Sequence, residues 1–172
     1  ASARAELEAL VRVNEFRNCF LAEELKAILE TMHQASLPTI PLKGFWLANH
    51  LYGDRNLRVT ADIDLMVPRE KVHQAVQLLV ARGYQADAPD WFFEDFQMRD
   101  SFECAMYKEH RGITFLVDVH WDLSWSAVER ERVWSEAKPD QFLGIPIWTL
   151  SEEWQLLFLA IHAARHDWQG LK

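Results

Sequence analysis

The stretch Ala61-Asp62-Ile63-Asp64-Leu65-Met66-Val67 decides how the rest of the chain is interpreted. Every second residue from Ile63 to Val67 is apolar, which is typical of a β-strand, and the following proline would end it. Residues two apart in a strand point to the same side, so we expect the carboxylates of Asp62 and Asp64 to lie side by side. Two such carboxylates resist ionisation unless a cation or a proton lies between them. The pattern therefore predicts a cation site, with a solvated acidic strand face as the alternative.

A third carboxylate stands on a later stretch that alternates in the same way. Gly112 to Trp121 reads as the second arm of a β-hairpin, and Asp118 lies there between two valines that face the core. If this strand neighbours the first one, three carboxylates converge and can hold two divalent ions, as in phosphoryl or nucleotidyl transfer. Mg²⁺ is the expected ion, with Mn²⁺ as the substitute, because Mg²⁺ takes its ligands from one or two carboxylates and from phosphates.

Four further residues are candidates for binding a substrate. His120 shares its side of the strand with Asp118, and it could contact a phosphate, act as a base or hydrogen-bond a neighbouring carboxylate. Lys43 and Gly44 end a short strand and open a helix, where free N–H groups can bind an anion that glycine lets approach closely. The alternative there is a plain turn with an exposed lysine. Arg58 could hold a triphosphate or form a salt bridge with the acidic residues, and both interpretations stay open.

Hydrophobic periodicity predicts the remaining elements. Helices are expected over Ala5 to Gln34, Phe45 to Tyr52, Glu70 to Arg82, Ser126 to Ala137 and Ser151 to about Trp168. Strands are expected over Thr39 to Leu42, Ala61 to Val67, Tyr84 to Ala86, Phe102 to Tyr107, Gly112 to Trp121 and Ile145 to Trp148. The hairpin turn is expected at Lys108-Glu109-His110-Arg111. Helices and strands mix without a regular βαβ repeat, so the predicted fold class is α+β, with a mixed β-sheet packed against helices.

Composition excludes several classes of protein. The chain has 172 residues, 49% of them apolar and 26% charged, a balance that no disordered or collagen-like protein shows. Its net charge of −8, from 18 Lys and Arg against 26 Asp and Glu, argues against a DNA duplex as the main partner. Cys19 and Cys104 form no CxxC motif, so we expect no disulfide and a cytoplasmic setting. The longest apolar block, Leu156 to Ile161, is too short to cross a membrane, so no membrane partner is expected.

Taken in order, these motifs resemble the uncharacterised nucleotidyltransferase family of the DNA polymerase β-like superfamily. The residues that carry the resemblance are Pro41-Leu42-Lys43-Gly44, Leu51-Tyr52, Arg58, Asp62 to Val67, Val117 to Trp121, His162 and His166-Asp167-Trp168. The resemblance implies that Asp62 and Asp64 bind metal and nucleotide phosphates, and that Asp118 holds a second metal and activates an acceptor hydroxyl. It also implies that Lys43, Gly44 and Arg58 steady the triphosphate. One departure is visible: the superfamily usually has Gly-Ser at the turn, whereas Phe45 follows Gly44 here.

The resemblance also sets the expected organisation of the chain. We divide it into an N-terminal helix (1–37), a nucleotidyltransferase-like core (38–150) and the start of a C-terminal helical region (151–172), which we expect to continue in a longer protein. His162 and His166 lie four apart on one helix face, where they could bind a metal or serve a structural or substrate-lining role. The residues between them include no glutamate, so zinc-protease chemistry is excluded.

The predicted function is Mg²⁺-dependent transfer of a nucleoside monophosphate from an NTP to a hydroxyl-bearing acceptor, which could be a small molecule, a sugar or a protein side chain. The alternative is a catalytically silent binding module that keeps this fold and serves as a partner protein in a biosynthetic or toxin–antitoxin system. The missing Gly-Ser turn favours the alternative, and the three carboxylates count against it.

Overall fold

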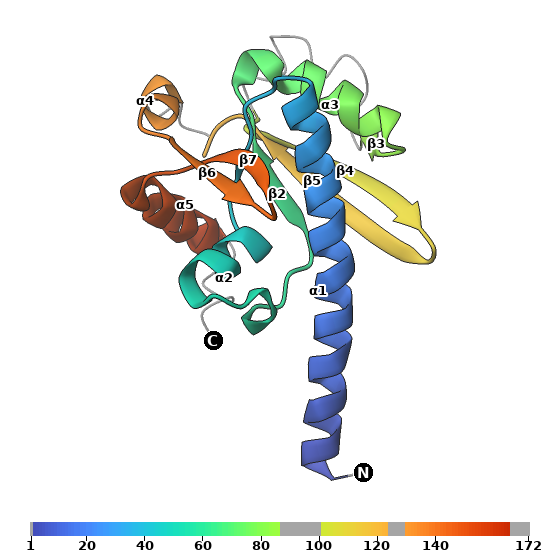
Figure 1. The fold of residues 1–172 in the computed structure, drawn as a ribbon. Helices are drawn as coiled ribbons and strands as arrows, with labels where there is room; N and C mark the ends of the chain where they lie inside the picture. The colour runs from blue at the N-terminus through green and yellow to red at the C-terminus, as the bar shows by residue number, and fades with distance from the viewer. Residues whose placement is uncertain (1, 87–100, 124–129, 166–172) are drawn as a thin grey trace.

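The structure is a computed structural model, and it describes residues 2–86, 101–123 and 130–165. Its α-helices are α1 Ala3–Gln34, α2 Phe45–Tyr52, α3 Val72–Ala81, α4 Arg130–Ser135 and α5 Glu152–Arg165, and its short 3₁₀ helices are η1 Arg55–Leu57 and η2 Arg69–Lys71. Its strands are β1 Ile40–Pro41, β2 Ile63–Met66, β3 Gln85–Ala86, β4 Glu103–His110, β5 Ile113–His120, β6 Lys138–Phe142 and β7 Ile145–Thr149. Figure 1 shows their arrangement.

Five strands form one mixed sheet in the order β1-β2-β5-β4-β3. The pairing of β2 with β5 is parallel, whereas the other pairs in this sheet are antiparallel. The hairpin β6–β7 forms a separate two-stranded sheet, and Trp148 N of β7 donates a hydrogen bond to Thr39 O just before β1. The predicted α+β class with a mixed sheet is therefore confirmed, and the two strands that carry the predicted carboxylates are neighbours.

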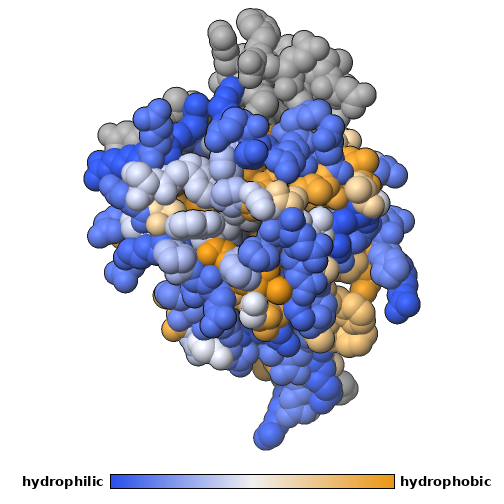
Figure 2. Space-filling view, turned by 45° about the horizontal axis from the view of Figure 1, so that its top comes forward, coloured by the Kyte–Doolittle hydropathy of each residue, from blue (hydrophilic) through white to orange (hydrophobic). Residues whose placement is uncertain are grey.

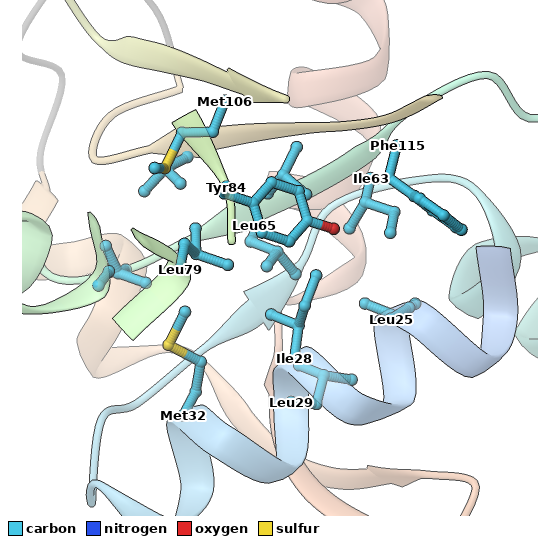
Figure 3. Close-up of a cluster of buried hydrophobic side chains, with 14 of the residues drawn as sticks. Leu25, Ile28, Leu29, Met32, Ile63, Leu65, Leu79, Tyr84, Met106 and Phe115 are labelled. Atoms are coloured by element: carbon cyan, nitrogen blue, oxygen red, sulfur yellow. The ribbon is translucent and has the colours of Figure 1, made fainter. Parts of the chain in front are cut away.

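Hydrophobic side chains cover both faces of the main sheet. On one face, Leu25 and Ile28 of α1 and Leu79 of α3 pack against Ile63 and Leu65 of β2, as Figure 3 shows. On the other face, Met66 packs with residues of β1, α4 and α5, including Trp154 and Phe158. Because Leu65 and Met66 are adjacent in the strand, they point to opposite faces. Full burial of each such side chain contributes roughly 1.5–3 kcal/mol, so both helical layers hold β2 in place.

The long helix α1 follows the predicted apolar pattern, but only its second half is covered. Leu21 and Leu25 are buried, whereas Leu7, Leu10 and Val11 are 63%, 65% and 55% exposed. Figure 1 shows the N-terminal turns of α1 extending past the other elements. Periodicity alone predicts an amphipathic helix and does not say how far along its apolar face the neighbouring elements reach. The rest of the surface seen in Figure 2 is mainly hydrophilic, with hydrophobic residues in separate patches.

The hairpin turn differs from the predicted one. Lys108, Glu109 and His110 belong to β4, and the turn consists of Arg111 and Gly112, whose φ angles are +52° and +75°. Two-residue turns with positive φ fit the right-handed twist of the flanking strands, which explains why the hairpin closes so tightly. The prediction of a turn over residues 108–111 is therefore wrong.

Other predicted elements fall partly outside the described residues. Of the helix expected over Ser126 to Ala137, the structure describes α4, and residues 126–129 lie outside the described part. The same holds for His166, Asp167 and Trp168. Cys19 is exposed on α1, and Cys104 is buried in β4. Within the three described ranges, the helices are all too short or too polar to cross a lipid bilayer.

Candidate active site

Three aspartates meet on one face of the main sheet. The parallel register of β2 and β5 sets Asp64 directly beside Asp118, and Asp62 immediately precedes β2. Each of the three offers a carboxylate oxygen, and these oxygens all lie within 4.8 Å of one another. The expected convergence of the three carboxylates is therefore found. Its cause is the adjacency of β2 and β5 together with the alternation of side chains along each strand.

The local environment gives Asp64 and Asp118 opposite pKa shifts. Burial pushes the pKa of Asp64 upward, but the hydrogen bond and charge of His120, together with Lys43, outweigh burial and leave this pKa lowered. Burial raises the pKa of Asp118 to about 6, and the negative charges of Asp64, Glu103 and Asp62 add to that effect, whereas His120 opposes it. The group of carboxylates thus carries more negative charge than its protein neighbours neutralise. Hard oxygen donors with surplus negative charge are the ligands that Mg²⁺ and related cations prefer, so the residues fit a divalent ion.

Lys43 lies within this acidic group. Its side chain is buried, and Nζ lies 3.2 Å from Asp62 Oδ2 and 3.1 Å from Asp64 Oδ2. The same ammonium group is 3.4 Å from Nε2 of His162 on α5. The alternative of an exposed lysine in a plain turn is therefore wrong. Lys43 is placed instead as the cation that faces two of the carboxylates.

Gly44 is required at the turn for two separate reasons. Its φ of +72° lies in the left-handed region, which residues with a side chain rarely adopt. A Cβ atom at this position would also lie 3.1 Å from Cγ2 of Thr60. The glycine therefore lets the chain turn from Lys43 into α2 with Thr60 packed against it. The Thr60 hydroxyl is buried, and within the described residues it has no hydrogen-bond partner.

His120 is enclosed behind the carboxylates. It is 2% exposed, and its Nε2 lies at hydrogen-bond distance, 3.2 Å, from Asp64 Oδ1. Of the three roles considered for it, the structure shows the hydrogen bond to a neighbouring carboxylate. Its Nδ1 lies 3.2 Å from Glu103 Oε2, and Arg165 of α5 donates to the other oxygen of Glu103 at 3.0 Å. Sequence reasoning missed Glu103 and Arg165. The signal that would have found Glu103 is the hairpin register, which sets it opposite His120.

Arg58 lies apart from this group. Its side chain is exposed, and no ion pair links it to Asp62, Asp64 or Asp118. Its backbone carbonyl accepts a hydrogen bond from Asn18 of α1 at 3.0 Å. The salt bridge with the acidic residues is therefore not formed, and phosphate binding by Arg58 stays a prediction.

A mixed sheet that sets three carboxylates on neighbouring strands beside a glycine turn defines a class of domains suited to phosphoryl or nucleotidyl transfer. Sequence comparison narrows this class: the chain matches the uncharacterised nucleotidyltransferase family over residues 1–172 and belongs to that family. It is therefore a transferase enzyme, and the alternative of a silent binding module is not supported. Among curated proteins, no sequence matches this chain.

A solved structure supports the fold assignment. The chain is similar to the crystal structure of ANT(2″)-Ia in complex with adenylyl-2″-tobramycin, with a TM-score of 0.51 and 18% sequence identity. The match covers 84% of this chain and 76% of that one. At this level of identity the similarity shows a shared fold. The nucleotidyltransferase-like fold is therefore confirmed by a comparison that does not depend on the short motifs.

Proposed function

We propose that this protein transfers a nucleoside monophosphate from an NTP to a hydroxyl group, with Mg²⁺ held by Asp62, Asp64 and Asp118. In this reaction the acceptor oxygen bonds to the α-phosphorus, the bond between the α- and β-phosphates breaks, and pyrophosphate and a proton are released. The observation that carries the proposal is the convergence of three carboxylates within 4.8 Å, with surplus negative charge, in a chain of this family.

The positions of the residues suggest which of them bind the metal ions, the phosphates and the acceptor. Asp62, just before β2, and Asp64, on β2, face Lys43 and would bind metal and the nucleotide phosphates. Asp118, on β5, would hold the second ion and face the acceptor hydroxyl, because it is less buried than Asp64 and has no ion pair with Lys43. When bound, Mg²⁺ would neutralise phosphate charge and lower the pKa of the acceptor hydroxyl. Lys43, the Gly44 turn and Arg58 would bind phosphate groups, the last two without contacting the carboxylates.

A small, hydroxyl-bearing molecule is the acceptor class that we favour. The similar structure, ANT(2″)-Ia, contains tobramycin that carries an adenylyl group. That ligand is a small molecule that carries an adenylyl group, which favours an acceptor of the same class here. A sugar is compatible with the same chemistry, and so is a hydroxyl on a protein side chain.

The proposal is tested by titrating the protein with each of the four NTPs by calorimetry, with and without Mg²⁺. At least one NTP is expected to bind, and to bind more tightly when Mg²⁺ is present. Asp62→Asn is expected to abolish the Mg²⁺ dependence, because it removes a charged ligand. Asp140→Asn, which changes an exposed aspartate of β6, is the matched control and should bind as the wild type does. If no NTP binds under any metal condition, the proposed function is wrong.

A further inference from the structure

Lys43 lies where a metal ion would have to bind. The oxygens nearest its Nζ are Oδ2 of Asp62 at 3.2 Å and Oδ2 of Asp64 at 3.1 Å, and both residues belong to the group with metal-ligand spacing. The side chains of Lys43 and Asp64 are 7% and 2% exposed, so water has little access to this pair, whereas Asp62 is 31% exposed. An ammonium group and a divalent cation repel each other, and here they would share the same two oxygens.

The two contacts of Lys43 differ in quality. Lys43 donates a hydrogen bond to Asp62 Oδ2, whereas it meets Asp64 Oδ2 at 3.1 Å in a buried ion pair that helps to lower the pKa of this carboxyl group. Asp64 Oδ2 is buried, and it receives no hydrogen bond from any residue in the described ranges. A buried carboxylate oxygen without a hydrogen bond is costly, since such groups are normally satisfied. Lys43 therefore compensates the charge of Asp64 without giving Oδ2 a well-directed hydrogen bond, and this oxygen can still accept a second ligand.

His162 gives the lysine another partner. Its Nε2 lies 3.4 Å from Nζ on the α5 side, and an unprotonated Nε2 can accept a hydrogen bond from the ammonium group. Lysine has three N–H donors on a flexible stem, so Nζ can turn away from the carboxylates and keep this acceptor. A phosphate oxygen would be a second acceptor close by.

We propose that Lys43 is a resident cation of the metal-free site, and that it leaves Asp62 and Asp64 when a metal ion enters and then binds a phosphate of the nucleotide. This inference rests on the proposed function and adds that metal binding and nucleotide binding are coupled through Lys43. A metal ion alone must displace Lys43 without offering it a new anion, and a nucleotide alone meets a surplus of carboxylates. When both bind, the nucleotide phosphate gives Lys43 a new anion and the metal ion neutralises the carboxylates, so each ligand raises the affinity for the other.

The test uses MnCl₂ as the probe and electron paramagnetic resonance of free Mn²⁺ as the readout, with no turnover needed. Binding is measured with Mn²⁺ alone and with the α,β-methylene analogues of the four NTPs. The key variant is Lys43→Met, which keeps the length of the side chain and removes its charge. The matched control is Lys71→Met, because Lys71 is an exposed lysine of η2.

In the wild type and in Lys71→Met, Mn²⁺ alone is expected to bind weakly, and a nucleotide analogue is expected to strengthen its binding. In Lys43→Met, binding of Mn²⁺ alone should be about tenfold tighter, and the strengthening by nucleotide should shrink by a similar factor. Lys43→Arg retains the charge, so it should keep the weak binding of Mn²⁺ alone. This variant also separates loss of charge from disruption of the fold, which circular dichroism checks for all four proteins.

Two different failures can be told apart. If the wild type binds Mn²⁺ together with a nucleotide analogue, but folded Lys43→Met binds Mn²⁺ alone no more tightly than Lys71→Met does, the role of Lys43 is wrong and the proposed function stands. If the wild type binds neither Mn²⁺ nor any analogue, in either order of addition, the proposed function and this inference fall together. If Lys43→Met does not fold, Lys43→Gln takes its place with the same expected results.

Discussion

The protein contains two groups of charged side chains that are largely removed from water, and they differ in how their charges balance. In the first, Asp62 and Asp64 form ion pairs with Lys43, and Asp118 lies beside them without an ion pair to this lysine. In the second, the carboxylate of Glu24 on α1 accepts hydrogen bonds from Lys108 of β4, Arg82 and the Tyr84 hydroxyl. We call the first the acidic group and the second the Glu24 group.

The pKa values of their carboxyl groups reflect this balance. Burial pushes the pKa of Glu24 upward, but the hydrogen bond and charge of Lys108, with smaller effects from Tyr84 and Arg82, leave it lowered. In the acidic group, burial and neighbouring carboxylates raise the pKa of Asp118 to about 6. The Glu24 group has two cations for one carboxylate, so its carboxylate is fully partnered and stabilises the fold. The acidic group has surplus negative charge and is incomplete without a cation. A perturbed pKa alone does not separate the two groups, because burial and Glu24 also raise the pKa of Tyr84 in the Glu24 group. The sign of the net charge distinguishes them.

The largest expected effect is on activity. Asp118→Asn should reduce nucleotidyl transfer by roughly 10³-fold or more, because it removes a charged ligand and leaves the fold in place. Glu24→Gln should leave transfer within a few-fold of the wild type. The measurement is the initial rate of pyrophosphate release, with the NTP that binds in the titration and a panel of hydroxyl-bearing acceptors. If both variants lose activity equally, the distinction between the two groups is wrong.

The second effect is on stability. Glu24→Gln should lower the free energy of unfolding by about 2 kcal/mol, since it leaves the charges of Lys108 and Arg82 without their carboxylate. Urea denaturation followed by circular dichroism measures this value. Glu109→Gln is the control, because Glu109 is an exposed residue of β4, and it should change stability by less than about 0.5 kcal/mol. Equal losses in the two variants would show that the Glu24 group does not stabilise the fold.

The third effect concerns the support of the acidic group by Glu103. Its carboxylate lies at ion-pair distance, 3.2 Å, from His120 Nδ1, without a hydrogen bond, and His120 in turn contacts Asp64. Outer partners of this kind orient ligands, so Glu103→Gln should weaken binding of Mn²⁺ with a nucleotide analogue by about tenfold. Electron paramagnetic resonance gives the affinity, and Glu109→Gln again serves as the control. An unchanged affinity would mean that the charge of Glu103 does not position His120.

Much of the acidic group could be predicted from the sequence, because it depends on local patterns. The alternation around Asp62 and Asp118 fixes which way each carboxylate points, and this needs no knowledge of the whole fold. The helix over Phe45 to Tyr52 was likewise predicted with the bounds that the structure shows, since glycines flank it on both sides.

What could not be predicted depends on register and on distant contacts. A turn over residues 108–111 would set Glu103 opposite Leu116, whereas the two-residue turn at Arg111 and Gly112 sets it opposite His120. Strand β6 was missed because its first four residues are all exposed, so it shows no alternation of apolar and polar residues. The burial of Lys43 depends on α5, which follows it by more than 100 residues and contributes His162.

The smallest effect is a difference in how the two groups respond to pH in metal-free protein. The pKa of Asp118 is about 6 in the fold against an ordinary value of 3.8, so the fold binds this proton more tightly than the unfolded chain does. The contribution of Asp118 to the free energy of unfolding therefore decreases as pH rises from about 4 to about 6. Asp118→Asn removes that loss, and because the carboxylate is only half-buried, we expect the variant to be more stable than the wild type by about 1–2 kcal/mol above pH 6. Near pH 4 the two should be equally stable.

Glu24 has a lowered pKa, so its contribution to the free energy of unfolding is fully present above its ordinary pKa of 4.5 and is lost as pH falls below that value. The difference in the free energy of unfolding between the wild type and Glu24→Gln should therefore stay constant between pH 5.5 and 7.5. Over the same range, the difference between the wild type and Asp118→Asn should rise to its plateau. Urea denaturation in the presence of EDTA at a series of pH values measures both curves. A stabilisation by Asp118→Asn that does not change with pH would mean that the charge of Asp118 is not its source.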